Sequence, residues 1–350
     1  MTTVSIALCT YNGECFLSAQ LKSLADQSMQ PSELVICDDQ SSDRTEEIIL
    51  SFAEAAPFEV RYFRNDRRLG YSKNFMKAVD LCRGDLIACC DQDDVWYPDK
   101  LELSTAPFSD ERVLLTYHQV DLINDAGKYI RSYGDRFPGT SLVAPLTGSP
   151  WVFGMGFTIV IRDTLKVGVE LSELTFDQNI PDKPVSHDQW YTFIASVLGH
   201  IAYIDRSLAG YRQHSANVVG VMEKLGADAR NLAEAVVYQA DEFERCSRAC
   251  FTRAQILRLL AEDLAPPLRV RALAGAERYA ALHKMFSLRN EMYRSPSVTK
   301  KWDLIRHLYL ASGYENNKPW SFGRKALIKD LLLSYVKPHR GQLQVMEGRH

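Results

Sequence analysis

The chain of 350 residues lacks the features that mark several large classes of protein. No uninterrupted apolar run reaches membrane-spanning length, and no basic segment followed by an apolar stretch suggests a secretory signal. The net charge of -3 gives no reason to expect nucleic acid as a partner. There is no fixed-period repeat and no low-complexity tract. These absences predict a cytoplasmic globular protein.

The eight cysteines lack the spacing of a metal site. Cys89 and Cys90 lie inside a short apolar run, where free thiols behave as small core hydrophobes. We therefore expect a reducing compartment and no disulfide framework.

Over about the first 120 residues, short apolar runs alternate with segments of helical periodicity. The expected strands are Val4–Cys9, Leu34–Cys37, Val60–Phe63 and Leu86–Cys90. Strands separated by helices predict an α/β fold: a Rossmann-like, mostly parallel sheet with helices on both faces and ligands at the carboxyl ends of its strands. In the middle of the chain we expect further elements, namely strands over Val113–Val120, Val152–Ile161, Ala202–Ile204 and Leu208–Tyr211 and a helix from His187 to Val197.

From about Met222 onwards the sequence favours helices, with a break expected at Pro266–Pro267. We therefore predict a catalytic domain over residues 1–220 and a helical C-terminal region over residues 221–350. The last segment mixes basic side chains with aromatic and aliphatic ones. This mixture suits an interfacial helix on an anionic membrane, but it also suits a helical lid packed on the main domain. Both interpretations stay open at this point.

The run Leu86–Cys90 ends in a carboxylate cluster formed by Asp91, Asp93 and Asp94. Crowded carboxylates repel one another unless a cation compensates them. Their hard oxygen atoms suit Mg2+ or Mn2+ shared with a substrate diphosphate. The alternatives are an Asp-rich surface turn and, for Asp94, a cap for a helix beginning near Pro98.

Several polar motifs, in this order and spacing, resemble those of the family 2 glycosyltransferases: Thr10–Tyr11–Asn12–Gly13, Asp38–Asp39 followed by Ser41, Asp43 and Thr45, Gly70–Tyr71–Ser72 followed by Asn74, and Asp91–Gln92–Asp93. Two later motifs are similar to those of bacterial rhamnosyltransferase-type members: His187–Asp188–Gln189–Trp190, and Tyr211–Arg212–Gln213–His214 followed by Asn217. The resemblance covers about the first 215 residues. It implies a GT-A fold, a nucleotide-diphosphate sugar donor, and Mn2+ or Mg2+ as cofactor.

The same resemblance implies which residues contact the donor and the metal. The implied nucleotide-sugar contacts are Thr10, Tyr11, Asn12, Asp39, Asn74 and Asp91. Among them, Asp39 would accept from a pyrimidine base, and Asp91 would face the ribose or a metal-bound water. Asp93 would coordinate the metal, with His214 as an additional ligand or diphosphate contact.

Asp188 is the candidate general base, expected at the start of a helix under the acceptor site. A carboxylate there also suits the N-terminus of a helix as a cap, and both roles can hold at once. Acceptor-binding or orienting roles are assigned to Gly156, His187, Trp190 and Arg212.

The predicted function is inverting, metal-dependent transfer of a sugar to a glycan or lipid-linked glycan acceptor in bacterial surface polysaccharide (O-antigen or capsule) biosynthesis. Only family likeness suggests rhamnose as that sugar. The protein would work at the inner face of the cytoplasmic membrane as a peripheral protein. One alternative is a haloacid-dehalogenase-like phosphatase with Asp91 as nucleophile, although that motif normally ends the first strand. The other is a non-catalytic glycan- or nucleotide-binding subunit.

Overall fold

The computed structural model describes residues 2–134, 139–151, 154–177, 180, 183–214, 232–316, 318–333 and 335. The chain divides into two compact units, one of residues 1–173 and 184–221 and one of residues 174–183 and 222–350. The predicted domain boundary after residue 220 stays a prediction. Asn217 and the first residues of the strand expected over Val152–Ile161 lie outside the described residues.

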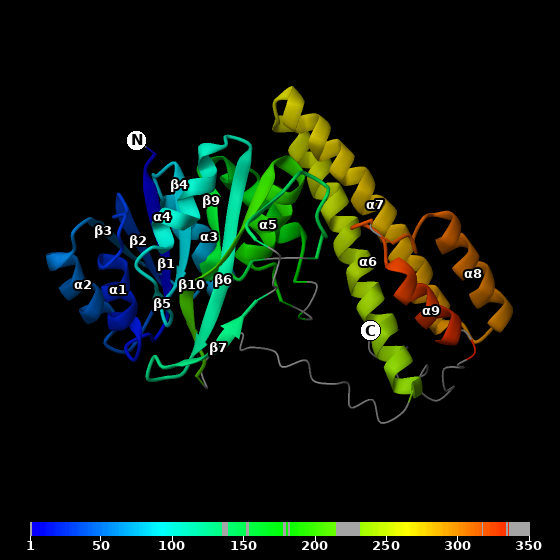
Figure 1. The fold of residues 1–350 in the computed structure, drawn as a ribbon, viewed down its shortest axis with the longest axis horizontal. Coiled ribbons are helices and arrows are strands. Elements are labelled where there is room, and N and C mark those ends of the chain that lie inside the picture. Colours follow the sequence, from blue (N-terminus) through cyan, green and yellow to red (C-terminus); the bar gives the residue numbers. More distant parts are fainter. Residues whose placement is uncertain are drawn as a thin grey trace. The chain divides into compact units, whose positions relative to one another are not determined.

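The first unit is built on one mixed sheet, whose strands run in the order β3-β2-β1-β4-β9-β6-β10-β5, with β7 beside β6 and β8 beside β10 (Figure 1). The strands are β1 (Val4–Thr10), β2 (Glu33–Asp38), β3 (Glu59–Arg64), β4 (Leu86–Asp91), β5 (Val95–Trp96), β6 (Val113–Ile123), β7 (Tyr129–Tyr133), β8 (Ser141–Val143), β9 (Val160–Arg162) and β10 (His200–Arg212). The first four expected strands are confirmed.

The parallel part of the sheet brings the predicted polar motifs to one edge. Strand β1 pairs in parallel with both β2 and β4, so that Thr10 lies opposite Asp38 and Cys9 lies opposite Asp91. Strands β1 and β2 are buried along their whole length because helices cover both faces of the sheet. The carboxyl ends of three strands thus meet where the sequence predicted a ligand site.

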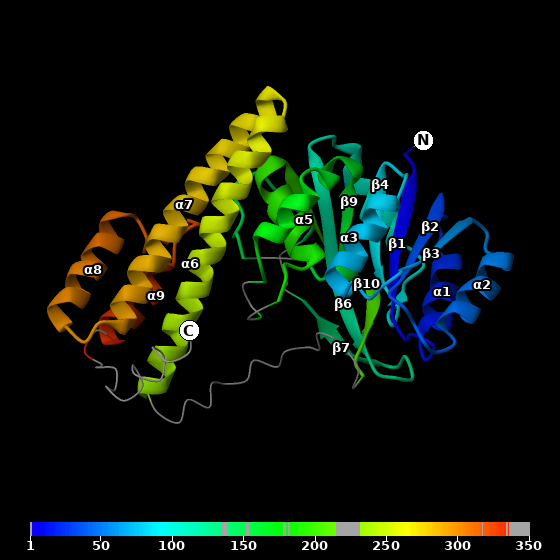
Figure 2. The ribbon, with the colours of Figure 1, turned by 180° about the vertical axis from the view of Figure 1, so that it is seen from behind.

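Helices lie on both faces of this sheet, as expected. Helices α1 (Leu17–Ala25), α2 (Thr45–Ala55) and α4 (Lys100–Thr105) lie on one face. Helices α3 (Tyr71–Leu81) and α5 (His187–Leu198) lie on the other, as Figure 2 shows from behind.

Two expectations for the middle of the chain were wrong. Instead of a strand up to Ile161, Gly156–Thr158 form a 3₁₀ turn, and β9 begins only at Val160. The two short strands expected around residues 202–211 are one strand, β10. Its register against β6 shifts between Ile204 and Ser207, so the polar residues between them sit in a bulge rather than ending the strand.

The second unit consists mainly of the helices α6 (Leu232–Asp263), α7 (Pro266–Arg294), α8 (Val298–Leu310) and α9 (Gly323–Leu333). Pro266 and Pro267 start α7 because the first helical positions need no backbone N–H donor. Among the described residues, no helix is both long enough and apolar enough to cross a bilayer.

A buried carboxylate fixes α9 to its neighbours. Asp330 is fully buried and accepts two hydrogen bonds from the Arg289 guanidinium, at 2.7 and 3.0 Å. It also accepts from the hydroxyl groups of Tyr293 at 2.8 Å and Tyr314 at 2.7 Å.

Candidate functional site

The two aspartates at the end of β2 hold the loops around the strand ends. Asp38 accepts hydrogen bonds from Thr10 Oγ1 at 2.8 Å and from the Ser41 backbone N–H at 2.9 Å. Asp39 accepts from the backbone N–H groups of Leu69 at 2.6 Å and Gly70 at 2.8 Å. Both carboxylates are buried, and neither caps α2. The donor-base contact implied for Asp39 stays a prediction.

Asn74 lies beneath this loop with its amide group engaged by the protein. Its Nδ2 donates to the Cys37 carbonyl oxygen and its Oδ1 accepts from Asn65 Nδ2, each at 2.8 Å. The side chain is buried, so it holds the Asn65 loop against β2. A direct donor contact by Asn74 stays a prediction.

The segment after β1 presents an aromatic ring at the site. The Tyr11 ring is 37% exposed, and the Arg68 guanidinium carbon lies 3.7 Å from its centroid. Asn12 has a φ of 46°, a left-handed conformation that Asn tolerates well, and its Oδ1 accepts from the Ser42 N–H at 2.9 Å. Gln92 exchanges two hydrogen bonds with the Tyr11 backbone, at 2.9 and 3.0 Å. The Tyr11 turn is therefore fixed directly to the carboxylate cluster.

The carboxylate cluster is strongly coupled electrostatically. Burial, followed by the charges of Asp93 and Asp188, raises the pKa of Asp91 to about 8, and the charge of Lys100 opposes the rise. Burial and then the charges of Asp93 and Asp91 hold the pKa of Asp94 well above its usual range. Folding also brings the start of α5 towards this cluster, because His187 packs against Gly156 and the turn that contains Gly156 lies next to β4.

Arg212 clamps this cluster from β10. Its Nε donates to the Asp93 carbonyl oxygen at 2.8 Å, and its backbone N–H donates to Asp94 Oδ1 at 3.1 Å. Its guanidinium also donates to the carbonyl oxygens of Asn124 and Asp125, at 3.1 and 2.7 Å. The predicted Asp94 cap is wrong, because the residue at the start of α4 is Asp99. Arg212 is a buried cation that orients the cluster.

Asp93 and His214, the predicted metal ligands, lie side by side. Asp93 Oδ2 and His214 Nε2 are 2.8 Å apart, and the Phe16 ring packs on the imidazole with centroids 4.7 Å apart. Within the described parts of the chain, no group of three or more His, Cys, Asp or Glu side chains is arranged to hold a metal. Mg2+ and Mn2+ commonly use one or two protein ligands and take the rest from substrate phosphates and water. The pair fits that pattern, as does Asp94 Oδ2, which is buried without a hydrogen-bond partner in the described structure.

Asp188 is the second residue of α5 and is half-buried, next to the buried His187 imidazole. The His187 ring stacks on Phe75 with centroids 3.9 Å apart and planes inclined by 15°. Burial lowers the pKa of His187 to about 4, opposed by the Asp188 charge, so the ring is neutral at physiological pH. A Cβ added to Gly156 would lie 2.5 Å from His187 Nε2. The absence of a side chain at Gly156 therefore makes room for the His187 ring.

Trp190 is fully buried and packs edge-on against Phe193, with centroids 5.9 Å apart. From there it can orient α5 but cannot contact an acceptor, so only the orienting part of its predicted role is compatible with the structure.

Three site residues escaped the sequence interpretation. Gln92 was the unassigned middle residue of its motif, and Arg68 belonged to none of the motifs. Lys100, fully buried beneath the cluster, had no recognisable signal except its proximity to the motif. Burial lowers the pKa of Lys100 to about 7, and the neighbouring Cys90 and Asp94 oppose that effect.

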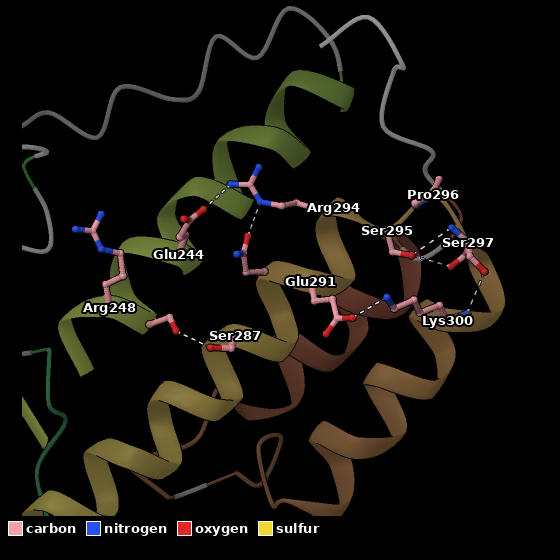
Figure 3. Close-up of a pocket in the computed structure, with 11 residues that line it drawn as sticks. Glu244, Arg248, Ser287, Glu291, Arg294, Ser295, Pro296, Ser297 and Lys300 are labelled. Atoms are coloured by element: carbon pink, nitrogen blue, oxygen red, sulfur yellow. Dashed lines mark hydrogen bonds and ion pairs between the residues drawn. The ribbon is translucent and has the colours of Figure 1, made fainter. Parts of the chain in front are cut away.

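The helical unit contains a pocket of about 710 Å3 between α6, α7 and the start of α8 (Figure 3). Four of its charged side chains form ion pairs: Arg294 with Glu244 at 2.8 Å and Lys300 with Glu291 at 2.7 Å. No coupled carboxylate cluster like that around Asp91 lines it. The candidate site therefore lies at the strand ends of the first unit.

Comparison with known proteins agrees with this geometry. Residues 5–166 match the family model described as glycosyl transferase family 2. The chain is 28% identical over 222 residues to an uncharacterized glycosyltransferase of Nostoc sp., covering 61% of this chain and 66% of that protein. It is 29% identical over 230 residues to the dTDP-rhamnosyl transferase RfbG of Shigella flexneri, covering 61% and 73%.

A third relative is the UDP-Glc:alpha-D-GlcNAc-diphosphoundecaprenol beta-1,3-glucosyltransferase WfgD of Escherichia coli, 30% identical over 130 residues, with 36% of this chain and 50% of that protein covered. Among solved structures, GalNAc-T7 with UDP, GalNAc and Mn2+ matches with a TM-score of 0.50 at 16% identity, covering 75% of this chain and 54% of that one. This likeness concerns the fold, and the predicted GT-A fold is confirmed.

Proposed function

Because residues 5–166 of this chain belong to glycosyl transferase family 2, we propose that the protein is an inverting, metal-dependent glycosyltransferase of bacterial surface polysaccharide biosynthesis. The donor is a nucleotide-diphosphate sugar and the acceptor a glycan or lipid-linked glycan. A dTDP- or UDP-activated sugar, rhamnose included, is proposed from the likeness to the relatives from Shigella and Escherichia. The single observation that carries the proposal is the meeting of Asp93 and His214, whose Oδ2 and Nε2 atoms lie 2.8 Å apart beside the carboxyl end of β4.

In the proposed reaction, the Asp188 carboxylate takes the proton of an acceptor hydroxyl group. The hydroxyl oxygen forms its bond to the anomeric carbon while the bond from that carbon to the diphosphate breaks. The leaving nucleoside diphosphate keeps the electron pair of that bond. Asp93 and His214 would hold the divalent cation, which supplies charge stabilisation for the leaving group when bound. Arg212 and Gln92 hold the turn on which these groups sit.

The test of the proposed base is Asp188→Asn. We expect transfer to fall by about 10²–10⁴-fold, the usual contribution of a general base, while donor affinity changes less than about twofold. The measurement combines a transfer assay with purified nucleotide sugars, dTDP-rhamnose among them, and donor binding by calorimetry. Asp26→Asn is the matched control, since Asp26 forms only an exposed ion pair with Lys22 on α1. If Asp188→Asn turned over substrate as fast as wild type, Asp188 could not be the general base.

We also propose that the helical unit binds anionic lipids at the inner face of the cytoplasmic membrane. The exposed apolar and basic side chains of α8 and α9 include Trp302, Arg306, Tyr309, Leu310, Arg324, Lys325, Ile328, Lys329 and Leu332, and α8 also exposes the acid Asp303. Leu310 and Leu332 are each 69% exposed. The only acid of α9, Asp330, is buried against Arg289, which leaves the exposed charges of that helix positive. Exposed apolar and basic side chains on two helices in contact suit anionic lipid.

The membrane proposal is tested by sedimentation with vesicles. We expect binding to phosphatidylserine-containing vesicles at low salt, release at high salt, and little binding to phosphatidylcholine alone. Ile328→Glu combined with Leu332→Glu should abolish it. Val270→Glu, at a position on α7 that is 67% exposed, is the matched control and should bind like wild type. Equal binding to both vesicle types would contradict an electrostatic membrane surface.

A further inference from the structure

Lys100 is a buried cation without an obvious structural purpose. It is the first residue of α4, and its side chain is fully buried. Its Nζ donates to the Phe157 carbonyl oxygen at 2.6 Å and lies 3.9 Å from the centroid of the Trp96 ring. A buried lysine is costly unless its charge is compensated, so a residue of this kind calls for a specific explanation.

The hydrogen bond of Lys100 connects the two halves of the site. On one side, the Lys100 ammonium group lies 3.9 Å from the centroid of the Trp96 ring, which β5 holds two residues after Asp94 of the carboxylate cluster. On the other side, Phe157 belongs to the 3₁₀ turn Gly156–Thr158. That turn contains the glycine against which His187 packs, immediately before the proposed base.

The two ends of this connection come from opposite faces of the sheet. Lys100 lies on α4 and His187 on α5, and the 3₁₀ turn runs between them at the carboxyl edge of β4. Phe75 on α3 closes the other side of the imidazole. The His187 ring thus lies between the Gly156 backbone and the Phe75 ring. Because it is held from both sides, a shift of the 3₁₀ turn must move the imidazole.

We propose that Lys100 is a positioning residue that couples the metal-binding turn to the base Asp188 through Phe157, Gly156 and His187. Lys100 does not touch the substrate. It fixes the 3₁₀ turn, and the turn fixes the imidazole that sets the start of α5. This inference rests on the proposed role of Asp188, and it predicts an effect on the start of α5 that can be measured without any activity.

The first experiment is hydrogen exchange on metal-free Lys100→Met protein, which keeps an unbranched side chain one atom shorter and removes the N–H donor. We expect the amides of residues 185–192 to exchange several-fold faster than in wild type. Lys301→Met is the matched control, because Lys301 is a buried lysine of the helical unit. It should leave residues 185–192 unchanged. Unchanged exchange at α5 in Lys100→Met would overturn the proposal whatever happens to activity.

The second experiment separates positioning from loss of the metal site. We expect Lys100→Met to lower kcat about 10- to 100-fold, since a shift of about 1 Å in a catalytic group can cost that much, while KM for the donor changes less than about threefold. Lys100→Arg, which keeps a charge and a donor, should recover part of kcat. If Lys100→Met weakened donor binding as much as it lowered kcat, the coupling to Asp188 would be overturned. If the wild-type protein transferred no sugar at all, only the proposed function would be rejected.

Gly156→Ala tests the same connection from its other end and keeps Lys100 intact. The added Cβ would displace His187, so the amides of residues 100–105 should also exchange faster if the connection is real. The double variant with Lys100→Met should lower kcat less than the product of the single effects, because both changes break one connection. The proposal would be refuted if the two substitutions lowered kcat by the full product of their single effects. It would also be refuted if Gly156→Ala left amide exchange in α4 unchanged.

Discussion

The raised pKa of Asp91 makes metal binding depend on pH in a way that can be calculated. With a pKa of about 8, about one tenth of the Asp91 carboxyl groups are ionised at pH 7 and about nine tenths at pH 9. A divalent cation beside this group displaces the proton, because binding favours the ionised form. Apparent affinity for Mg2+ and a nucleoside diphosphate should therefore rise about tenfold from pH 6 to pH 7 and only about twofold from pH 8 to pH 9.

The sign of the stability effect follows from the same shift. The folded protein holds a proton on Asp91 that the unfolded chain releases at its lower, ordinary pKa. The stabilisation from this group is complete below about pH 4 and is lost as the pH rises through about 8. Metal-free protein should accordingly lose stability between pH 5 and pH 8 from this group, and added Mg2+ should restore part of it at pH 8.

Calorimetry in buffers of different ionisation enthalpy gives the decisive measurement. Binding of Mg2+ and nucleoside diphosphate at pH 7 should release close to one proton, and Asp91→Asn should abolish that release. An affinity that stays constant from pH 6 to pH 9, or binding without proton release in wild type, would show that the Asp91 carboxyl group is already ionised and that the reasoning is wrong.

Two further expectations concern buried ionic groups. Arg212→Met removes the donor to the carbonyl oxygens of Asp93 and Asp125, so the turn loses its fixed shape and donor and metal binding should weaken by about tenfold or more, measured by calorimetry. Wild-type affinity in that variant would show that the turn holds its shape without Arg212. Asp330→Ala leaves the Arg289 guanidinium buried without its partner, which should cost about 3–5 kcal/mol, measured by urea unfolding. A loss below about 1 kcal/mol would mean that Arg289 reaches water in the variant.

Local sequence signals were enough for the parallel part of the fold. The apolar runs that end in Thr10, Asp38 and Asp91 are buried strands, and parallel pairing necessarily brings their carboxyl ends to one edge. The same signals failed around Gly156, where a glycine-containing apolar stretch forms a 3₁₀ turn because it packs against the His187 ring. Whether this stretch forms a strand or a turn is therefore decided by its tertiary contact with His187, which lies 31 positions later in the chain.

By itself, the order of residues determined the chemical inventory: carboxylates after a buried strand, a histidine, and an Asp at a helix start. These are properties of short segments, and short segments carry their own propensities and periodicities. The tertiary structure alone decided which of them meet. It placed Asp188 near Asp91, the His214 imidazole next to the Asp93 carboxylate, and the Lys100 ammonium group against the Phe157 carbonyl oxygen. Such encounters depend on how distant elements pack, because burial and charge compensation are set by neighbours that no local pattern encodes.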